Sequence, residues 1–171
     1  LEARERELAE TLVRQEATAE VLRAIANSAA DAELALQAIA ESAARLLDVT
    51  DADIMRVEGD VLRSVAKHGP SRQWPMGSVR PINRDWVTGR AVVDRAIVHV
   101  PDLQTAKAEF PEGAVYARQY GHRTTLATPL LRDGIAIGAI LLRRMDMRPL
   151  TEKQIALLKM FADQAVIAFE N

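Results

Sequence analysis

Hydrophobic positions are densest between His122 and Arg144, where the pattern predicts a β-hairpin. The first strand covers Thr124 to Leu131, and the second covers the almost wholly apolar run Ile135 to Leu142. Asp133-Gly134 lies between them and supplies the positive φ angles that a tight hairpin turn requires. Because both faces of the second strand are apolar, we expect it to be covered on both sides.

Heptad spacing appears at both ends of the chain and predicts two helices that pair with a second copy. Leu1 to Ala26 contains neither Gly nor Pro, and its seam includes Leu8, Leu12 and Leu22. A final helix begins at Thr151, with Gln154 placed to complete a capping box. Its seam consists of Ile155, Leu158, Ala162, Ala165 and Phe169. The alternative for the first helix is packing against its own domain, and the last helix offers a second stripe that could cover the sheet.

Between these ends the pattern alternates between helical and extended periods. It predicts helices over Ala32–Leu47, Asn83–Asp94 and Ala114–Tyr120, strands over Ala52–Glu58, Val61–Lys67 and Ile97–Val100, and a loop over Gly69–Arg80. With the central hairpin this gives an α+β fold, in which helices cover a mostly antiparallel sheet of about five or six strands. We expect residues 1–30 to form a separate helix and residues 31–171 to form the domain.

Composition excludes several functions. The 171 residues carry a net charge of −2, so bulk charge points to neither nucleic acid nor an anionic membrane. The absence of cysteine excludes disulfides, thiol catalysis and thiolate metal sites within these residues. The three histidines have no metal-ligand spacing, and no catalytic constellation is found. No secretion signal or membrane-spanning run appears, which predicts a cytoplasmic protein without membrane contact.

Three segments carry a resemblance to a known family. They are Ile97 to Asp102, Thr128 to Ile140, and Pro149 to Asn171. Their order resembles a GAF domain, a PAS-related sensor module, and the last segment is similar to the final helix of GAF domains in bacterial histidine kinases and nucleotide cyclases. The helix before residue 31 resembles the signalling helices that join such modules.

The resemblance implies a non-catalytic sensory and dimerisation module of a bacterial signalling protein, such as a two-component system. A homodimer, an unknown small-molecule ligand and a kinase or cyclase output domain outside this chain would be its partners. The chain lacks the signature of cyclic-nucleotide-binding members and the cysteine of bilin-binding members and sulfoxide reductases. A purely structural dimerisation domain is the alternative.

The sequence also offers candidates for a pocket over the sheet. Aromatic side chains in the loop and helices above it could stack on a planar ligand, although they could equally fill the core. The predicted pocket residues are Met55, Trp74, Trp86, His99, Tyr116, Tyr120, His122, Leu126 and Thr128. A haem-binding variant would need one histidine, such as His99, as an axial ligand. No cofactor is otherwise predicted.

Overall fold

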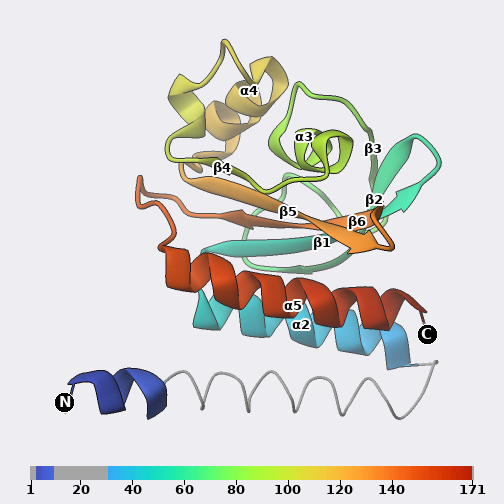
Figure 1. Ribbon diagram of the computed structural model, residues 1–171. Coiled ribbons are helices and arrows are strands. Elements are labelled where there is room, and N and C mark those ends of the chain that lie inside the picture. Colours follow the sequence, from blue (N-terminus) through green and yellow to red (C-terminus); the bar gives the residue numbers. More distant parts are fainter. Residues whose placement is uncertain (1–2, 10–30, 171) are drawn as a thin grey trace.

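The computed structural model describes residues 3–9 and 31–170. Its centre is one antiparallel sheet in the order β3-β2-β1-β6-β5-β4. The strands are β1 (Asp51–Glu58), β2 (Val61–His68), β3 (Val79–Pro81), β4 (Val98–Val100), β5 (Thr125–Arg132) and β6 (Ile135–Arg143). The sheet is covered by helices on both faces (Figure 1), which confirms the predicted α+β class.

The predicted hairpin is the pair β5 and β6, and β6 lies at the centre of the sheet beside β1. Asp133 and Gly134 adopt φ angles of 52° and 78°, as a two-residue turn between twisted strands requires. Ile140 is buried in the core on one face of the sheet, and Leu141 is buried in the separate core on the other face. The expectation that this strand is covered on both sides is therefore confirmed.

Two helices cover one face of the sheet, called the lower face below: α2 (Ala32–Leu46) and α5 (Glu152–Glu170). They lie side by side under the strands (Figure 1) and enclose a core that includes Ile39, Phe161 and Leu142. The predicted capping box opens α5. Gln154 accepts a hydrogen bond from the Thr151 N–H at 2.9 Å, and the Gln154 N–H donates to the Thr151 hydroxyl at 3.1 Å.

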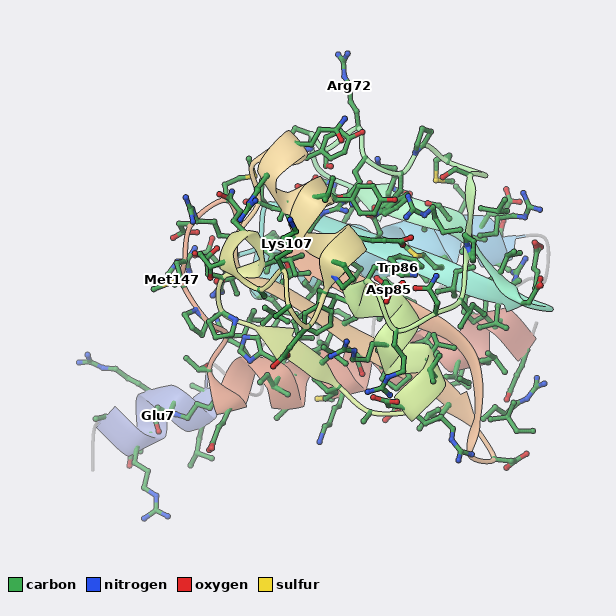
Figure 2. All side chains as sticks on the ribbon, turned by 90° about the horizontal axis from the view of Figure 1, so that it is seen from above. Glu7, Arg72, Asp85, Trp86, Lys107 and Met147 are labelled. Carbon is green, nitrogen blue, oxygen red and sulfur yellow. The ribbon has the colours of Figure 1, made fainter. Side chains whose placement is uncertain are left out.

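Shorter elements cover the opposite, upper face. They are α3 (Val87–Asp94), the 3₁₀ turn η2 (Leu103–Thr105) and α4 (Pro111–Tyr120). Their core is separate from the lower one and includes Met55, Trp74 and Trp86. In Figure 2, which looks down on this side, Trp86 lies in the crowded centre, whereas Arg72 extends outward from its loop.

The predicted boundaries are wrong in three places, one of which is the start of α4 at Pro111 rather than Ala114. α3 begins at Val87 rather than Asn83, because the Asn83 side chain accepts a hydrogen bond from the Asp85 N–H and holds a turn there. The predicted loop Gly69–Arg80 ends in β3, whose three residues are too few to show an alternating pattern.

The predicted seam of the last helix needs correction. Leu158 and Ala165 are fully buried, and Ala162 is nearly so, all in the chain's own lower core. These side chains therefore pack within one molecule and do not face a second subunit. Ile155 and Phe169 are partly buried against the same core. At the other end Leu8 is 60% exposed, whereas Leu12 and Leu22 lie outside the described residues.

Candidate ligand-binding site

The candidate site is a chamber between the upper face of the sheet and the layer of α3 and α4. Its remaining free volume is about 10 Å³, roughly the space that one water molecule needs. The lining residues are Gln73, Trp74, Trp86, Val87, Thr88, Leu103, Gly113, Tyr116, His122, Thr125 and Leu141. The chain's own side chains therefore fill the chamber almost completely.

A buried ion pair joins strands β1 and β6 of the sheet. Arg143 on β6 donates to Asp53 on β1 at 2.6 Å, and the two side chains are 1% and 0% exposed. Arg143 also donates to the Gln73 side chain at 2.9 Å. Burial raises the pKa of Asp53, while the positive charges of Arg143 and Lys67 oppose that rise. Within residues 3–9 and 31–170, the second carboxylate oxygen of Asp53 and Nε of Arg143 have no hydrogen-bond partner.

Other unpartnered polar atoms share this side of the sheet. Among the described residues, seven buried side-chain polar atoms lack a partner, and six of them lie on the upper side. They are Asp53 Oδ1, Ser64 Oγ, Trp74 Nε1, Thr88 Oγ1, His122 Nδ1 and Arg143 Nε. Buried polar groups in native proteins are normally paired, so these atoms need partners from ordered water or from another molecule. The six atoms include both donors and acceptors.

His122 is 2% exposed and carries one of these atoms. Burial, with a smaller contribution from Arg143, lowers the pKa of His122 to about 3. The ring is therefore neutral at physiological pH and can both donate and accept a hydrogen bond.

The domain should lose stability on acidification because of this ring. Between pH 6.5 and 3 the unfolded chain binds a proton at His122 that the folded chain does not, so folding is disfavoured as pH falls. The expected loss from pH 7 to pH 5 is about 2 kcal/mol. Urea unfolding measures the free energy of unfolding at both pH values. Its loss between pH 7 and pH 5 should be smaller by this amount in His122→Gln than in the wild type. His68→Gln removes an exposed histidine and is the control. An equal loss of stability in His122→Gln and in the wild type would contradict the assignment of this pH dependence to His122.

Three aromatic rings, called the aromatic box below, form one end of the chamber. They are Trp74, Trp86 and Tyr116. Trp86 is fixed by a 3.0 Å hydrogen bond from its indole N–H to the Pro81 carbonyl. Gly89 allows this packing, since a Cβ there would come within 2.4 Å of the Trp86 indole nitrogen. The guanidinium of Arg80 lies among the three rings.

The structure brings together five of the nine predicted pocket residues. Met55 and the aromatic box share the upper core, and His122 lines the chamber. Tyr120 instead lines a separate surface cavity of about 360 Å³, together with Asp51, Arg72 and His122. His122 therefore lies between the two cavities.

The other three predicted residues, His99, Leu126 and Thr128, point away from the chamber. Leu126 belongs to the lower core, and His99 is its partner across β4 and β5. Thr128 lines an open groove of about 430 Å³ between β5 and α5. Their assignment to the pocket is wrong, because successive residues of a strand alternate between faces and these three face the lower side.

His99 has a structural role. Its Nε2 accepts a hydrogen bond from the Leu150 N–H at 3.2 Å, and this contact holds the segment that leads into α5. Burial lowers the pKa of His99, which favours the neutral ring that this acceptor role requires. His99 is therefore not placed as a haem ligand over the chamber. Among residues 3–9 and 31–170 no group of three His, Cys, Asp or Glu side chains could hold a metal ion.

The sequence analysis missed Asp53, Arg143 and Arg80. A signal existed for the first two, since each is a charged residue in an otherwise apolar strand, and such residues are buried only when they are paired. Arg80 had no signal of this kind because it lies in β3, which was predicted as loop.

Comparison with known proteins decides the family. The sequence profile of the GAF domain matches residues 31–169. The chain belongs to the GAF family. GAF domains are sensory and regulatory modules, and this GAF domain shares its fold with several solved members. A search among curated proteins finds no significant match.

Three solved structures illustrate the range of relatives. The GAF domain of an Acinetobacter phosphoenolpyruvate-protein phosphotransferase superposes with a TM-score of 0.76 at 11% identity, covering 92% of this chain and 93% of that one. A methyl-accepting chemotaxis protein gives 0.74 at 25% identity, covering 88% and 94%. A free methionine-R-sulfoxide reductase from Neisseria meningitidis, solved in complex with its substrate, gives 0.75 at 20% identity, covering 94% and 90%.

Proposed function

We propose that this GAF domain is a non-catalytic sensory and dimerisation module of a cytoplasmic signal-transduction protein. It binds a small polar molecule in the chamber and passes the signal through its terminal helices to a kinase or cyclase domain. The observation that carries this proposal is that three residues lining the chamber, Trp74, Thr88 and His122, each have a buried polar atom without a partner among the described residues. No helix among the described residues has the length and apolar character to cross a bilayer.

The polar set favours binding over a purely structural role. An unsatisfied buried group costs about 1–3 kcal/mol, so the three around one chamber need a compensating role. A ligand with both donors and acceptors supplies the missing partners. The side chains of Trp74 and Trp86 in the chamber wall are almost fully buried, so a ligand there would bind where hydrogen bonds are strong.

A short path connects this site to the terminal helices. Arg143 binds both Asp53 and the chamber residue Gln73, whereas Ile54 and Leu142, the residues next to this ion pair in sequence, belong to the core between the sheet and the helices α2 and α5. A change in the spacing of β1 and β6 therefore reaches α5 through one layer of backbone. Signal transfer requires that the ligand binds one arrangement of these helices better than the other.

Dimerisation is assigned to the outer side of the helical layer below the sheet. Leu34 on α2 and Ile167 on α5 are 69% and 41% exposed, and Leu8 in the helical segment 3–9 is 60% exposed. This segment lies on the same side of the sheet as α2 and α5 (Figure 1), and Glu7 pairs with Lys153 at 2.7 Å. Exposed apolar side chains there can pair with their copies in a parallel bundle.

A structural dimerisation domain without ligand is the second candidate. The chamber's free volume of about 10 Å³ favours it, because no ligand fits unless side chains move. Enzymatic reduction of a sulfoxide by a thiol is excluded for these 171 residues, which contain no cysteine.

Thr88→Val separates the two candidates. Thr88 is fully buried and its hydroxyl has no partner. If a ligand binds there, native mass spectrometry of freshly purified wild type should show a bound small mass that Thr88→Val loses. Thr128→Val changes a buried threonine on the opposite face and should retain it. A wild type without bound mass, together with a Thr88→Val variant more stable by about 1 kcal/mol, would establish the structural alternative.

A further inference from the structure

The aromatic box has the geometry of a cation-binding cage. The Trp74 and Trp86 ring centroids lie 5.4 Å apart with planes at 48°, and Tyr116 meets Trp74 edge-on at 5.2 Å and 73°. The two indoles are only 4% and 3% exposed. Rings inclined in this way present their negatively polarised faces to a shared space.

That space is occupied by the chain's own cation. The guanidinium carbon of Arg80 lies 4.2 Å from the Trp74 ring centroid, 4.3 Å from that of Tyr116 and 5.5 Å from that of Trp86. Its one side-chain hydrogen bond in the described part of the chain is a long 3.4 Å contact to Glu112. Attraction to the rings therefore holds the guanidinium more than polar contacts do.

We propose that the aromatic box is a subsite for an organic cation, a quaternary ammonium or guanidinium group, and that Arg80 occupies it until such a ligand displaces it. This deepens the proposed function, on which it rests, by naming the charged part of the ligand. Aromatic cages bind quaternary ammonium groups because the rings replace part of the cation's hydration.

Arg80 can leave while the box stays in place. It lies on the edge strand β3 between the exposed residues Val79 and Pro81, and its side chain is 21% exposed. Its partner Glu112 is 43% exposed. Departure of this guanidinium leaves the ring faces that it covers open to a ligand.

The box also connects to the polar set. Trp74 belongs to both, since its indole N–H is one of the six unpartnered atoms. A molecule with its cationic group among the rings can therefore reach this donor and the neighbouring Thr88 with its polar end. Both residues line the same chamber.

Competition with Arg80 sets the expected affinities. The apparent Kd of a ligand equals its intrinsic Kd divided by the fraction of molecules whose box is open. Arg80→Ala opens the box in every molecule and should bind tetramethylammonium at least about tenfold more tightly than wild type. Glu112→Gln keeps the box and weakens only the anchor of Arg80, so a gain of about twofold is expected.

Intrinsic fluorescence reports the site directly, because both tryptophans of the chain belong to the box. Tetramethylammonium and choline are titrated into wild type, Arg80→Ala and Glu112→Gln, with 3,3-dimethylbutan-1-ol as the neutral isostere of choline. Arg56→Ala, which removes an arginine stacked on Phe169 elsewhere, is the control and should behave as wild type.

The proposal is supported if the cations cause saturable fluorescence changes and bind most tightly to Arg80→Ala, less tightly to Glu112→Gln and least tightly to the wild type. Equal binding of the neutral isostere, or no cation response in a folded Arg80→Ala, would overturn it. If Arg80→Ala does not fold, the test depends on Glu112→Gln. A Glu112→Gln variant that binds tetramethylammonium no more tightly than the wild type would then overturn the proposal. A Thr88-dependent bound mass without cation binding would leave the proposed function intact and remove only the cation subsite.

Discussion

Arg143→Met should lower the free energy of unfolding by about 3–5 kcal/mol, because it leaves a buried carboxylate without its counter-charge. Asp53 is 0% exposed and takes its 2.6 Å hydrogen bond from Arg143. The guanidinium also donates to Gln73, so the substitution frees the loop that carries Trp74. Methionine fills much of the arginine's volume, which limits the effect of packing on the result.

The matched control is the double variant Asp53→Val/Arg143→Met. Replacing both partners by apolar side chains removes the unpaired charge, so most of the lost stability should return. Urea unfolding at pH 7 of the wild type and the two variants measures the difference. Because burial raises the pKa of Asp53, the single variant should also lose less at acidic pH, where the carboxyl is protonated. A double variant as unstable as the single one would show that packing, not charge, explains the loss.

Local chemistry made the hairpin and the start of the last helix predictable. Asp133-Gly134 specifies a turn by its allowed φ angles, and Thr151 with Gln154 specifies a helix start by mutual hydrogen bonds. Both signals act within four residues, so they do not depend on the rest of the fold. The start of α3 was predicted wrongly although its signal is equally local, since the Asn83 side chain accepts a hydrogen bond from the Asp85 N–H two residues later.

The face of each strand residue was much harder to predict. A shift of one residue in strand register moves every side chain to the other face. β1 and β2 contain such a shift between Ile54 and Met55, and β5 and β6 contain another at Leu130 and Leu131. His99 and Thr128 lie outside both shifts, and they were misplaced because alternation along a strand does not say which of its two faces is the upper one.

The polar set was invisible in sequence for a related reason. Ser64, Thr88 and His122 are ordinary residues in ordinary elements, and only tertiary packing brings their unpartnered atoms to one side of the sheet. Arg80 illustrates the same limit, since an arginine in a predicted loop gives no sign that it lies among three rings. Aromatic residues alone identified the region.

For α5 the pattern was visible in the sequence but ambiguous, because apolar residues spaced 3 and 4 apart fit two kinds of packing. The same period describes a stripe facing the chain's own sheet and a seam facing a second chain. Burial of Leu158 and Ala165 shows the former. Any pairing with a twin must therefore use the other side of the layer, where Leu34 and Ile167 lie exposed.

Leu158→Glu should consequently unfold the domain rather than separate a dimer. Leu158 is 0% exposed in the lower core, and an unpaired charge there should cost about 4 kcal/mol or more. Far-UV circular dichroism should show loss of the cooperative thermal transition. Ile167→Glu, on the exposed side of the same helix, should change the stability by no more than about 0.5 kcal/mol.

The same pair of variants tests the dimer by sedimentation velocity. If the outer side of α2 and α5 is the interface, Ile167→Glu should sediment as a folded monomer under conditions where the wild type is a dimer. A Leu158→Glu variant that melts like wild type and sediments as a monomer would place Leu158 at a subunit contact instead. That result would require α5 to turn its buried stripe outward, away from Phe161 and the sheet that it covers in one molecule.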